Sequence, residues 1–399
     1  MTQTVLQALH VPNQYQDLYS ALDKQLSDFG ETVRSKWDGS KHPTRYGPQL
    51  LMASASMYQS FLKPSYEAGV LTELQQIKAT GANAVTINVN FPLMSRAFHT
   101  RNKTDFNAIA DFYSRLAKFI RNQGMNLIVT TTVCTPLAGR DAGGLDTYLK
   151  TLSWDDYRAG RAENAVNVAT IIGPDYLSLI TEPDTEAGAS GQSALNAATG
   201  AVQMVNQMLQ AVRAAHVPNI KVGAGFGSWS MKDPSWLTSF LQTAIDYLDL
   251  HVYPVNKDFL LNLITAADAA SAAGKQIGMS EAWAYKARDI ELNKLTYSEG
   301  FARDVFSFWA PLDSKFLQAL VEFSHFKKAA FLSPFWTHYF YAYLEFAKFA
   351  SDSDADLIQA SNIAAGKAYQ TGVPTLTGRT WASLIGSTPD TSTPPDQTR

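Results

Sequence analysis

Eight short apolar runs along the chain alternate with longer segments in which apolar residues recur at helical spacing. Short runs bounded by turn residues are typical of buried strands, and the longer spacing predicts amphipathic helices. The predicted strands are residues 50–54, 84–90, 126–134, 176–182, 221–226, 247–253, 276–281 and 330–335. Strands separated by helices favour parallel pairing, and eight such repeats allow the sheet to close. We therefore expect an α/β fold, a (β/α)₈ TIM barrel.

Helical spacing fills the intervals between these strands and continues after the last one. The predicted helices are residues 66–79, 106–122, 155–172, 194–215, 234–244, 257–273, 298–328 and 339–369. An open doubly wound sheet is the rival arrangement. It is disfavoured because no Gly-x-Gly-x-x-Gly motif follows the first strand to bind a dinucleotide.

The two ends of the chain have patterns of their own. Residues 13–37 have helical spacing that places Tyr15, Leu18, Leu22 and Phe29 on one face, so an extra N-terminal helix is expected beside or beneath the barrel. We expect a helical extension over 1–45, a catalytic barrel over 46–385 and a disordered tail or truncated linker over 386–399, which is rich in Pro, Ser and Thr.

Composition narrows the possible partners. The chain has 399 residues, of which 46% are hydrophobic, and a net charge of −3, so nothing indicates a nucleic-acid partner. No stretch is long and apolar enough to cross a membrane, and the single cysteine, Cys134, excludes an internal disulfide. We expect no membrane partner, and either a secreted or periplasmic protein whose signal has been removed or, otherwise, a cytoplasmic one. The sequence does not indicate an oligomeric state.

Two carboxylates stand at the ends of predicted strands. Glu182 closes the fourth strand and Glu281 the seventh, and in a parallel barrel these ends meet at the mouth where chemistry is done. Acetal hydrolysis needs a proton for the leaving oxygen and a negative group on the opposite face of the anomeric carbon. Two glutamates that reach one mouth from opposite sides are suited to that reaction.

Three short motifs carry a resemblance to a known group. Thr181-Glu182-Pro183, the segment from Leu250 to Pro254 that contains His251 and Tyr253, and Ser280-Glu281-Ala282-Trp283 resemble the retaining (β/α)₈ glycoside hydrolases of clan GH-A, which include cellulases, mannanases and galactanases. The resemblance implies that Glu182 is the acid/base and Glu281 the nucleophile. It also implies that Tyr253 hydrogen-bonds the nucleophile and that Trp336 forms the floor of the subsite for the cleaved sugar. The motifs do not assign a family within the clan.

One position departs from the pattern of that clan. The clan usually places Asn before the acid/base, where it hydrogen-bonds the sugar 2-hydroxyl, whereas this chain has Thr181. Either the substrate lacks that contact, Asn90 at the end of the second strand supplies it, or activity is weakened or lost.

Other residues near the predicted mouth are candidates for substrate contacts. His251 lies two positions before Tyr253 and therefore on the same strand face; it is either a hydrogen-bonded core residue or part of the active-site network. Asp184 and Glu186 are expected to be solvated loop charges. Aromatic side chains suited to packing against sugar rings gather at the same strand ends: Phe226, Trp229, Tyr253, Trp283, Tyr285, Phe335 and Trp336.

Three functions fit these residues. The leading hypothesis is a retaining glycoside hydrolase that degrades a β-linked oligo- or polysaccharide without a cofactor. A second is a metal-dependent sugar isomerase or lyase in which Glu182, His251 and Glu281 bind a divalent cation. A third is a carbohydrate-binding protein on a degenerate hydrolase scaffold, for which Thr181 is the motivating residue.

Overall fold

The computed structural model describes residues 3–134, 144–292 and 294–386. The predicted tail over 386–399 therefore lies, apart from its first residue, outside the described residues. Within the described part of the chain, no helix has the combination of length and apolarity needed to cross a membrane.

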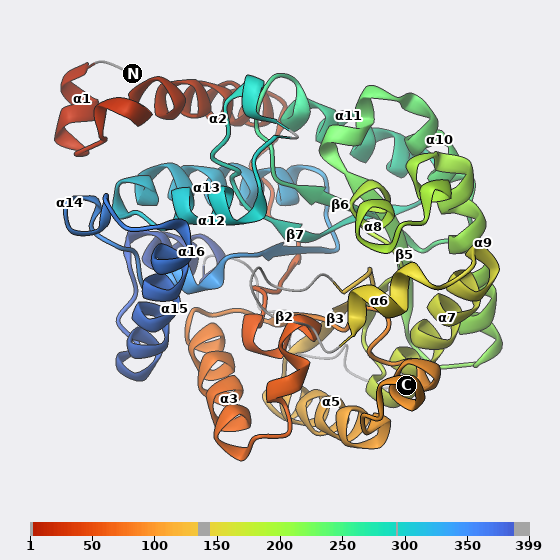
Figure 1. The fold of residues 1–399 in the computed structure, drawn as a ribbon. Helices are drawn as coiled ribbons and strands as arrows, with labels where there is room; N and C mark the ends of the chain where they lie inside the picture. The colour runs from red at the N-terminus through yellow and green to blue at the C-terminus, as the bar shows by residue number, and fades with distance from the viewer. Residues whose placement is uncertain (1–2, 135–143, 293, 387–399) are drawn as a thin grey trace, which may run out of the picture.

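Eight parallel strands form one sheet, in the order β1-β8-β7-β6-β5-β4-β3-β2. Figure 1 labels β2, β3, β5, β6 and β7 among them. A parallel bridge between Gln49, just after β1, and Thr86 in β2 brings the two ends of the sheet together. The prediction of a (β/α)₈ barrel is confirmed. The strands are β1 Arg45–Tyr46, β2 Ala84–Asn88, β3 Asn126–Thr130, β4 Tyr176–Ser178, β5 Lys221–Gly227, β6 Tyr247–Val252, β7 Gln276–Ala282 and β8 Phe331–Pro334.

Seven of the eight predicted strands match observed ones, and the first does not. Residues 51–53 of the predicted run 50–54 form a short 3₁₀ helix, whose Leu51 and Met52 N–H groups donate to the Glu73 carboxylate. The first strand lies earlier in the chain, where Arg45 N–H donates to Ala330 O and Gly47 N–H to Leu332 O. It was missed because this segment is short and polar.

Large rings fill one end of the barrel interior. Tyr176, Tyr247 and Phe331 pack edge to face, with ring centroids 5.0 to 5.8 Å apart. Gly223 and Gly278 leave room for them, because a Cβ atom at either position would come within 2.2 Å of the Tyr247 or the Phe331 ring. The barrel is therefore a packed core at this end, and the opposite end, at the carboxyl ends of the strands, is the one where ligands bind in such barrels.

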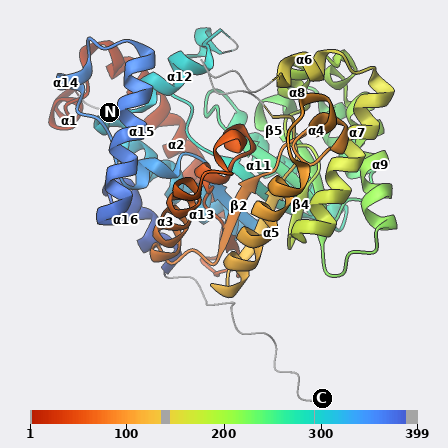
Figure 2. The same cartoon turned by 60° about the horizontal axis from the view of Figure 1, so that its bottom comes forward.

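Helices cover the outside of the barrel, as Figures 1 and 2 show from two directions. Most predicted helices are present. The predicted segment 298–328 is divided into α12, Tyr297–Asp304, and α13, Ala310–Phe326. The predicted segment 339–369 contains the short α14, Phe346–Phe349, before α15, Asp354–Thr371. Among the described residues, five helices were not predicted: α1, α4, α6, α8 and α16. The helices are α1 Gln3–Ala8, α2 Gln16–Lys36, α3 Pro64–Ala79, α4 Arg96–Asn102, α5 Phe106–Asn122, α6 Leu145–Lys150, α7 Trp154–Asn167, α8 Pro183–Ser190, α9 Ala198–Ala214, α10 Pro234–Leu241, α11 Phe259–Ala272, α12 Tyr297–Asp304, α13 Ala310–Phe326, α14 Phe346–Phe349, α15 Asp354–Thr371 and α16 Leu376–Gly386.

The predicted N-terminal helix is α2, and it packs along α13 (Figure 1). Its apolar face is buried, with the Tyr19 ring stacked on Trp309 at 5.5 Å and the Phe29 ring 5.6 Å from Phe323. Lys315 of α13 also donates to the Asp23 carboxylate of α2. The helix is thus fixed to the outer layer of the barrel by its hydrophobic face.

Candidate active site

A cavity of about 680 Å³ opens at the carboxyl ends of the strands. The segments that follow β4, β5, β6, β7 and β8 line it, together with helix α12. In a barrel of parallel strands this mouth is where ligands bind. Glu182 and Glu281 both line the cavity.

The two glutamates converge from opposite parts of the sequence. A carboxylate oxygen of Glu182 lies within 4.8 Å of one of Glu281. Glu182 directly precedes α8, which begins with Pro183 at a position where proline is favoured. In glycoside hydrolysis, carboxyl groups about 5 Å apart are suited to direct attack by one of them, whereas a wider separation leaves room for a water molecule.

A bulge in β7 helps to position Glu281. Asp249 of β6 pairs with Gly278 of β7, and His251 of β6 pairs with Glu281 of β7. Two steps along β6 therefore correspond to three steps along β7, so β7 contains one extra residue. Such a bulge changes the direction in which the next side chains point. Ser280 N–H donates to Asp249 Oδ1 at 2.9 Å, which fixes the backbone beside the glutamate.

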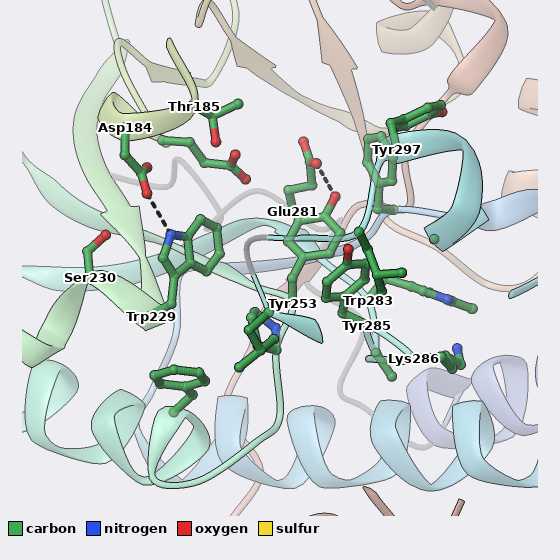
Figure 3. A pocket seen from close by; sticks show the side chains of 18 of the residues that line it. Asp184, Thr185, Trp229, Ser230, Tyr253, Glu281, Trp283, Tyr285, Lys286 and Tyr297 are labelled. Atoms are coloured by element: carbon green, nitrogen blue, oxygen red, sulfur yellow. Dashed lines mark hydrogen bonds between the residues drawn. The ribbon is translucent and has the colours of Figure 1, made fainter. Parts of the chain in front are cut away.

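His251 and Tyr253 contact one glutamate each. His251 Nδ1 lies 2.8 Å from Glu182 Oε1, and its Nε2 lies 2.9 Å from Ser280 Oγ. The Tyr253 hydroxyl donates to Glu281 Oε1 (Figure 3), as the resemblance implies. Both side chains come from the end of β6, so one strand end supports both carboxylates.

The pKa values of the three charged groups depend on one another. Burial raises the pKa of Glu281, the His251 charge opposes that effect and Glu182 reinforces it, which leaves the pKa at about 7. Burial lowers the pKa of His251, but the Glu281 and Glu182 carboxylates outweigh it and raise that pKa to about 9. Burial also raises the pKa of Glu182, but the hydrogen bond and charge of His251 lower it overall. Near neutral pH, therefore, His251 and Glu182 hold one proton between them, while Glu281 loses its own proton as the pH rises through about 7.

Aromatic rings continue from the glutamates across the cavity. Tyr253 lies edge to face with Trp229 at 6.4 Å and with Phe335 at 6.1 Å, and Phe335 contacts Trp336 at 4.4 Å. Trp336 packs in turn against Phe301 of α12. All five residues line the cavity, and flat apolar faces of this kind suit the C–H faces of sugar rings.

Solved structures resemble the chain in fold. Native xylanase10C from Cellvibrio japonicus aligns at a TM-score of 0.52 and 12% identity, over 90% of this chain and 74% of that one. GH5_18 from Streptomyces cattleya in complex with GlcNAc aligns at 0.52 and 13% identity, over 88% and 82%. A GH5_18 variant from Bifidobacterium longum subsp. longum ATCC 55813 in complex with Manb1-4GlcNAc aligns at 0.53 and 13% identity, over 86% and 78%.

The chain shares their fold. The resemblance to (β/α)₈ glycoside hydrolases is thereby confirmed at the level of architecture. No protein-family model matches the sequence, and no curated protein does.

Four of the predicted substrate-binding residues have little or no access to the cavity, and one of them is His251, which is 2% exposed and does not line it. Thr181 is fully buried, and its hydroxyl has no hydrogen-bond partner among the described residues. Asn90 is also buried and does not line the cavity. Trp283 lines it but is only 1% exposed, because its ring packs inward and its Nε1 donates to Asp304 at 2.8 Å. Sugar contacts by these four residues stay predictions.

The carboxylates of Asp184 and Glu186, which were expected to be solvated, have protein partners instead. Glu186 is completely buried in α8, where it forms an ion pair with the equally buried Arg161 and accepts from the Tyr157 hydroxyl. Asp184 lines the cavity and accepts from Trp229 Nε1 at 2.8 Å. The prediction was wrong for Glu186, because its partner lies 25 residues away on a helix that only the fold brings near. Phe226, expected at the mouth, is instead buried against the Phe240 ring.

The segment after β7 supplies a wall of the cavity that the sequence did not indicate. Leu292, Leu295 and Tyr297 line it, although nothing in their spacing distinguishes them from other apolar loop residues. This segment is held from outside by Arg288, which donates to both carboxylate oxygens of Asp17 in α2 at 2.9 and 3.1 Å. The N-terminal helix thus supports the cavity wall.

Glu182, His251 and Glu281 also meet the distance requirement for a shared metal ion, because one potential ligand atom from each lies within 4.8 Å of the others. Both ring nitrogens of His251 are already hydrogen-bonded, one to Glu182 and one to Ser280. Since a metal ligand must offer a free nitrogen lone pair, a cation would have to replace one of these two hydrogen bonds of His251.

Proposed function

We propose that this protein is a retaining glycoside hydrolase that cleaves a β-linked oligo- or polysaccharide, with Glu281 as nucleophile and Glu182 as acid/base. The observation that carries the proposal is the approach of the two carboxylates to within 4.8 Å in one cavity. That separation suits direct attack on the sugar, and the shared fold with glycoside hydrolases agrees with it.

The first step forms a bond between a Glu281 oxygen and the anomeric carbon as the bond from that carbon to the leaving oxygen breaks. The proton shared by His251 and Glu182 passes through Glu182 to the leaving oxygen, so His251 serves as the reserve for an acid whose own pKa is low. In the second step, water attacks the anomeric carbon and releases Glu281, while Glu182 takes the proton of that water. The Tyr253 hydroxyl stabilises the Glu281 carboxylate before attack and after release.

The test is a panel of 4-nitrophenyl β-glycosides and β-linked oligosaccharides assayed with the wild type and with Glu281→Gln. The variant retains the size of the side chain but not its charge, and its turnover is expected to fall about a thousandfold or more. Glu31→Gln, at an exposed position on α2, is the matched control and should keep wild-type turnover. Equal turnover by Glu281→Gln and wild type would remove the nucleophile assignment, and sugar binding without product release by the wild type would favour a binding protein.

Glu182→Ala separates the acid/base role from the nucleophile role. Azide needs no proton abstraction, so it can attack a glycosyl enzyme that lacks the base. Added azide should raise the turnover of an activated aryl glycoside by Glu182→Ala and yield a β-glycosyl azide. An α-glycosyl azide would contradict a double displacement.

A metal-dependent sugar isomerase or lyase is the second candidate, favoured by the cluster of Glu182, His251 and Glu281. Activity on free sugars that EDTA abolishes and Mn²⁺ restores would support it. Hydrolysis that EDTA leaves unchanged would exclude it for the reaction observed.

A further inference from the structure

Trp229 forms a flat wall at one end of the cavity. It directly follows Ser228, the first residue of the short 3₁₀ helix Ser228–Lys232 after β5, and its side chain is half-buried. Figure 3 shows Trp229 and Asp184 on one side of the pair formed by Tyr253 and Glu281, with Tyr297 on the other side. The two ends of the cavity are therefore distinct.

The Trp229 ring is held in place by three contacts. Its Nε1 donates to Asp184 Oδ2 at 2.8 Å, and its ring meets Tyr253 edge to face at 6.4 Å. The ring also lies against the bare backbone of Gly227, where a Cβ atom would come within 2.2 Å of it. An aromatic ring fixed in this way loses little conformational entropy when a ligand packs on it.

The link to Asp184 places Trp229 on the side of the acid. Asp184 is in the first turn of α8, two residues after Glu182. Because the acid protonates the leaving oxygen, the leaving group must lie on the Glu182 side of the cleaved bond. Trp336, in contrast, packs against Phe301 and Tyr297, and Tyr297 lies on the other side in Figure 3.

Polar side chains line the cavity in the same segment as Trp229. Ser230 and Lys232 belong to the same 3₁₀ helix as Trp229 and line the cavity, as does Asn196; Asn196 and Lys232 are exposed. Amide, hydroxyl and ammonium groups can bind several hydroxyls of a sugar at once. A small alcohol or a purely apolar leaving group would form few hydrogen bonds with these groups.

We propose that Trp229, oriented by Asp184, is the platform for the first sugar of the leaving group, so that the natural substrate is an oligosaccharide chain continuing past the cleaved bond. This inference rests on the proposed function and specifies its substrate class. The leaving sugar packs one face on the indole, while the polar side chains beside it bind its hydroxyls.

The test compares substrates that share the retained sugar but differ in leaving group. The probes are β-D-glucosyl, mannosyl, xylosyl and galactosyl fluorides and the β-1,4-linked oligosaccharides of the same sugars. Fluoride has no ring to pack on Trp229 and needs no strong acid catalysis, so its hydrolysis reports the nucleophile alone. In Trp229→Ala, the ratio of kcat/KM for the oligosaccharide to kcat/KM for the matched fluoride should fall about tenfold.

Two further variants make the result decisive. Trp229→Phe retains a flat ring without the bond to Asp184, and the ratio should fall about threefold. Trp37→Ala, which removes an indole stacked on His325 outside the cavity, should leave the ratio unchanged. The inference is overturned if Trp229→Ala keeps the wild-type ratio, or if both substrates lose activity equally, as a purely structural role would produce. If the wild type hydrolyses none of the fluorides, the proposed function itself fails.

Discussion

Replacing Tyr253 with Phe removes the hydroxyl that donates to Glu281 and changes little else in the packing. This hydrogen bond lowers the pKa of Glu281, which burial raises to about 7. A hydrogen bond to a charged group is worth roughly 1.5–3 kcal/mol, and one pKa unit corresponds to about 1.4 kcal/mol. Losing the bond should therefore raise the pKa of Glu281 by about one to two units.

The change should appear in the pH dependence of kcat/KM for an aryl glycoside, measured from about pH 5 to about pH 10. In the proposed mechanism Glu281 attacks in its ionised form, so wild-type activity should rise with pH through about 7. It should fall through about 9, where the pair of His251 and Glu182 loses its proton. In Tyr253→Phe the rising limb should move to about 8–9 and approach the falling limb, so that the maximum is lower and narrower.

Tyr285→Phe is the control, because Tyr285 lines the same cavity without a hydrogen bond to Glu281 among the contacts of the described residues. Its rising limb should match that of the wild type. A rising limb that stays in place in Tyr253→Phe, or moves to lower pH, would refute the reasoning. The bond would then not stabilise the charged form of Glu281.

Two other substitutions test the surroundings of the site. His251→Gln removes the group that, in the proposed mechanism, holds the proton of the acid, so the falling limb should move from about 9 to lower pH. An unchanged falling limb in the same pH series would assign that limb to another group. Glu186→Gln leaves the Arg161 guanidinium buried without its counter-charge, which should lower the free energy of unfolding by about 3–5 kcal/mol in urea titrations. Glu67→Gln, at an exposed ion pair, should cost about 1 kcal/mol or less, and equal losses in the two variants would contradict the role of burial.

The barrel and its two glutamates could be predicted because both depend on local pattern and on one geometric rule. Buried strands give continuous apolar runs, and the carboxyl ends of parallel strands meet at one edge. Glu182 and Glu281 each stand at the end of such a run. Counting runs was therefore sufficient to bring together two residues that the sequence separates widely.

The residues that surround the glutamates could not be predicted in the same way. The first strand was missed because Arg45, Pro48 and Gln49 do not resemble a buried run, although backbone hydrogen bonds to β8 extend through them. Asp184 and Glu186 looked alike in sequence, yet one orients a tryptophan and the other is buried against an arginine. Such differences depend on partners that only tertiary structure supplies.

The contact between Arg288 and Asp17 has a practical consequence for anyone who shortens this protein. A truncation that begins at the first strand would look harmless, since it would keep both glutamates and every β-strand. It would also delete α2, and the segment carrying Leu292, Leu295 and Tyr297 would lose its outer anchor. Expression tags and fusion partners should therefore be added before α2 and should not replace it.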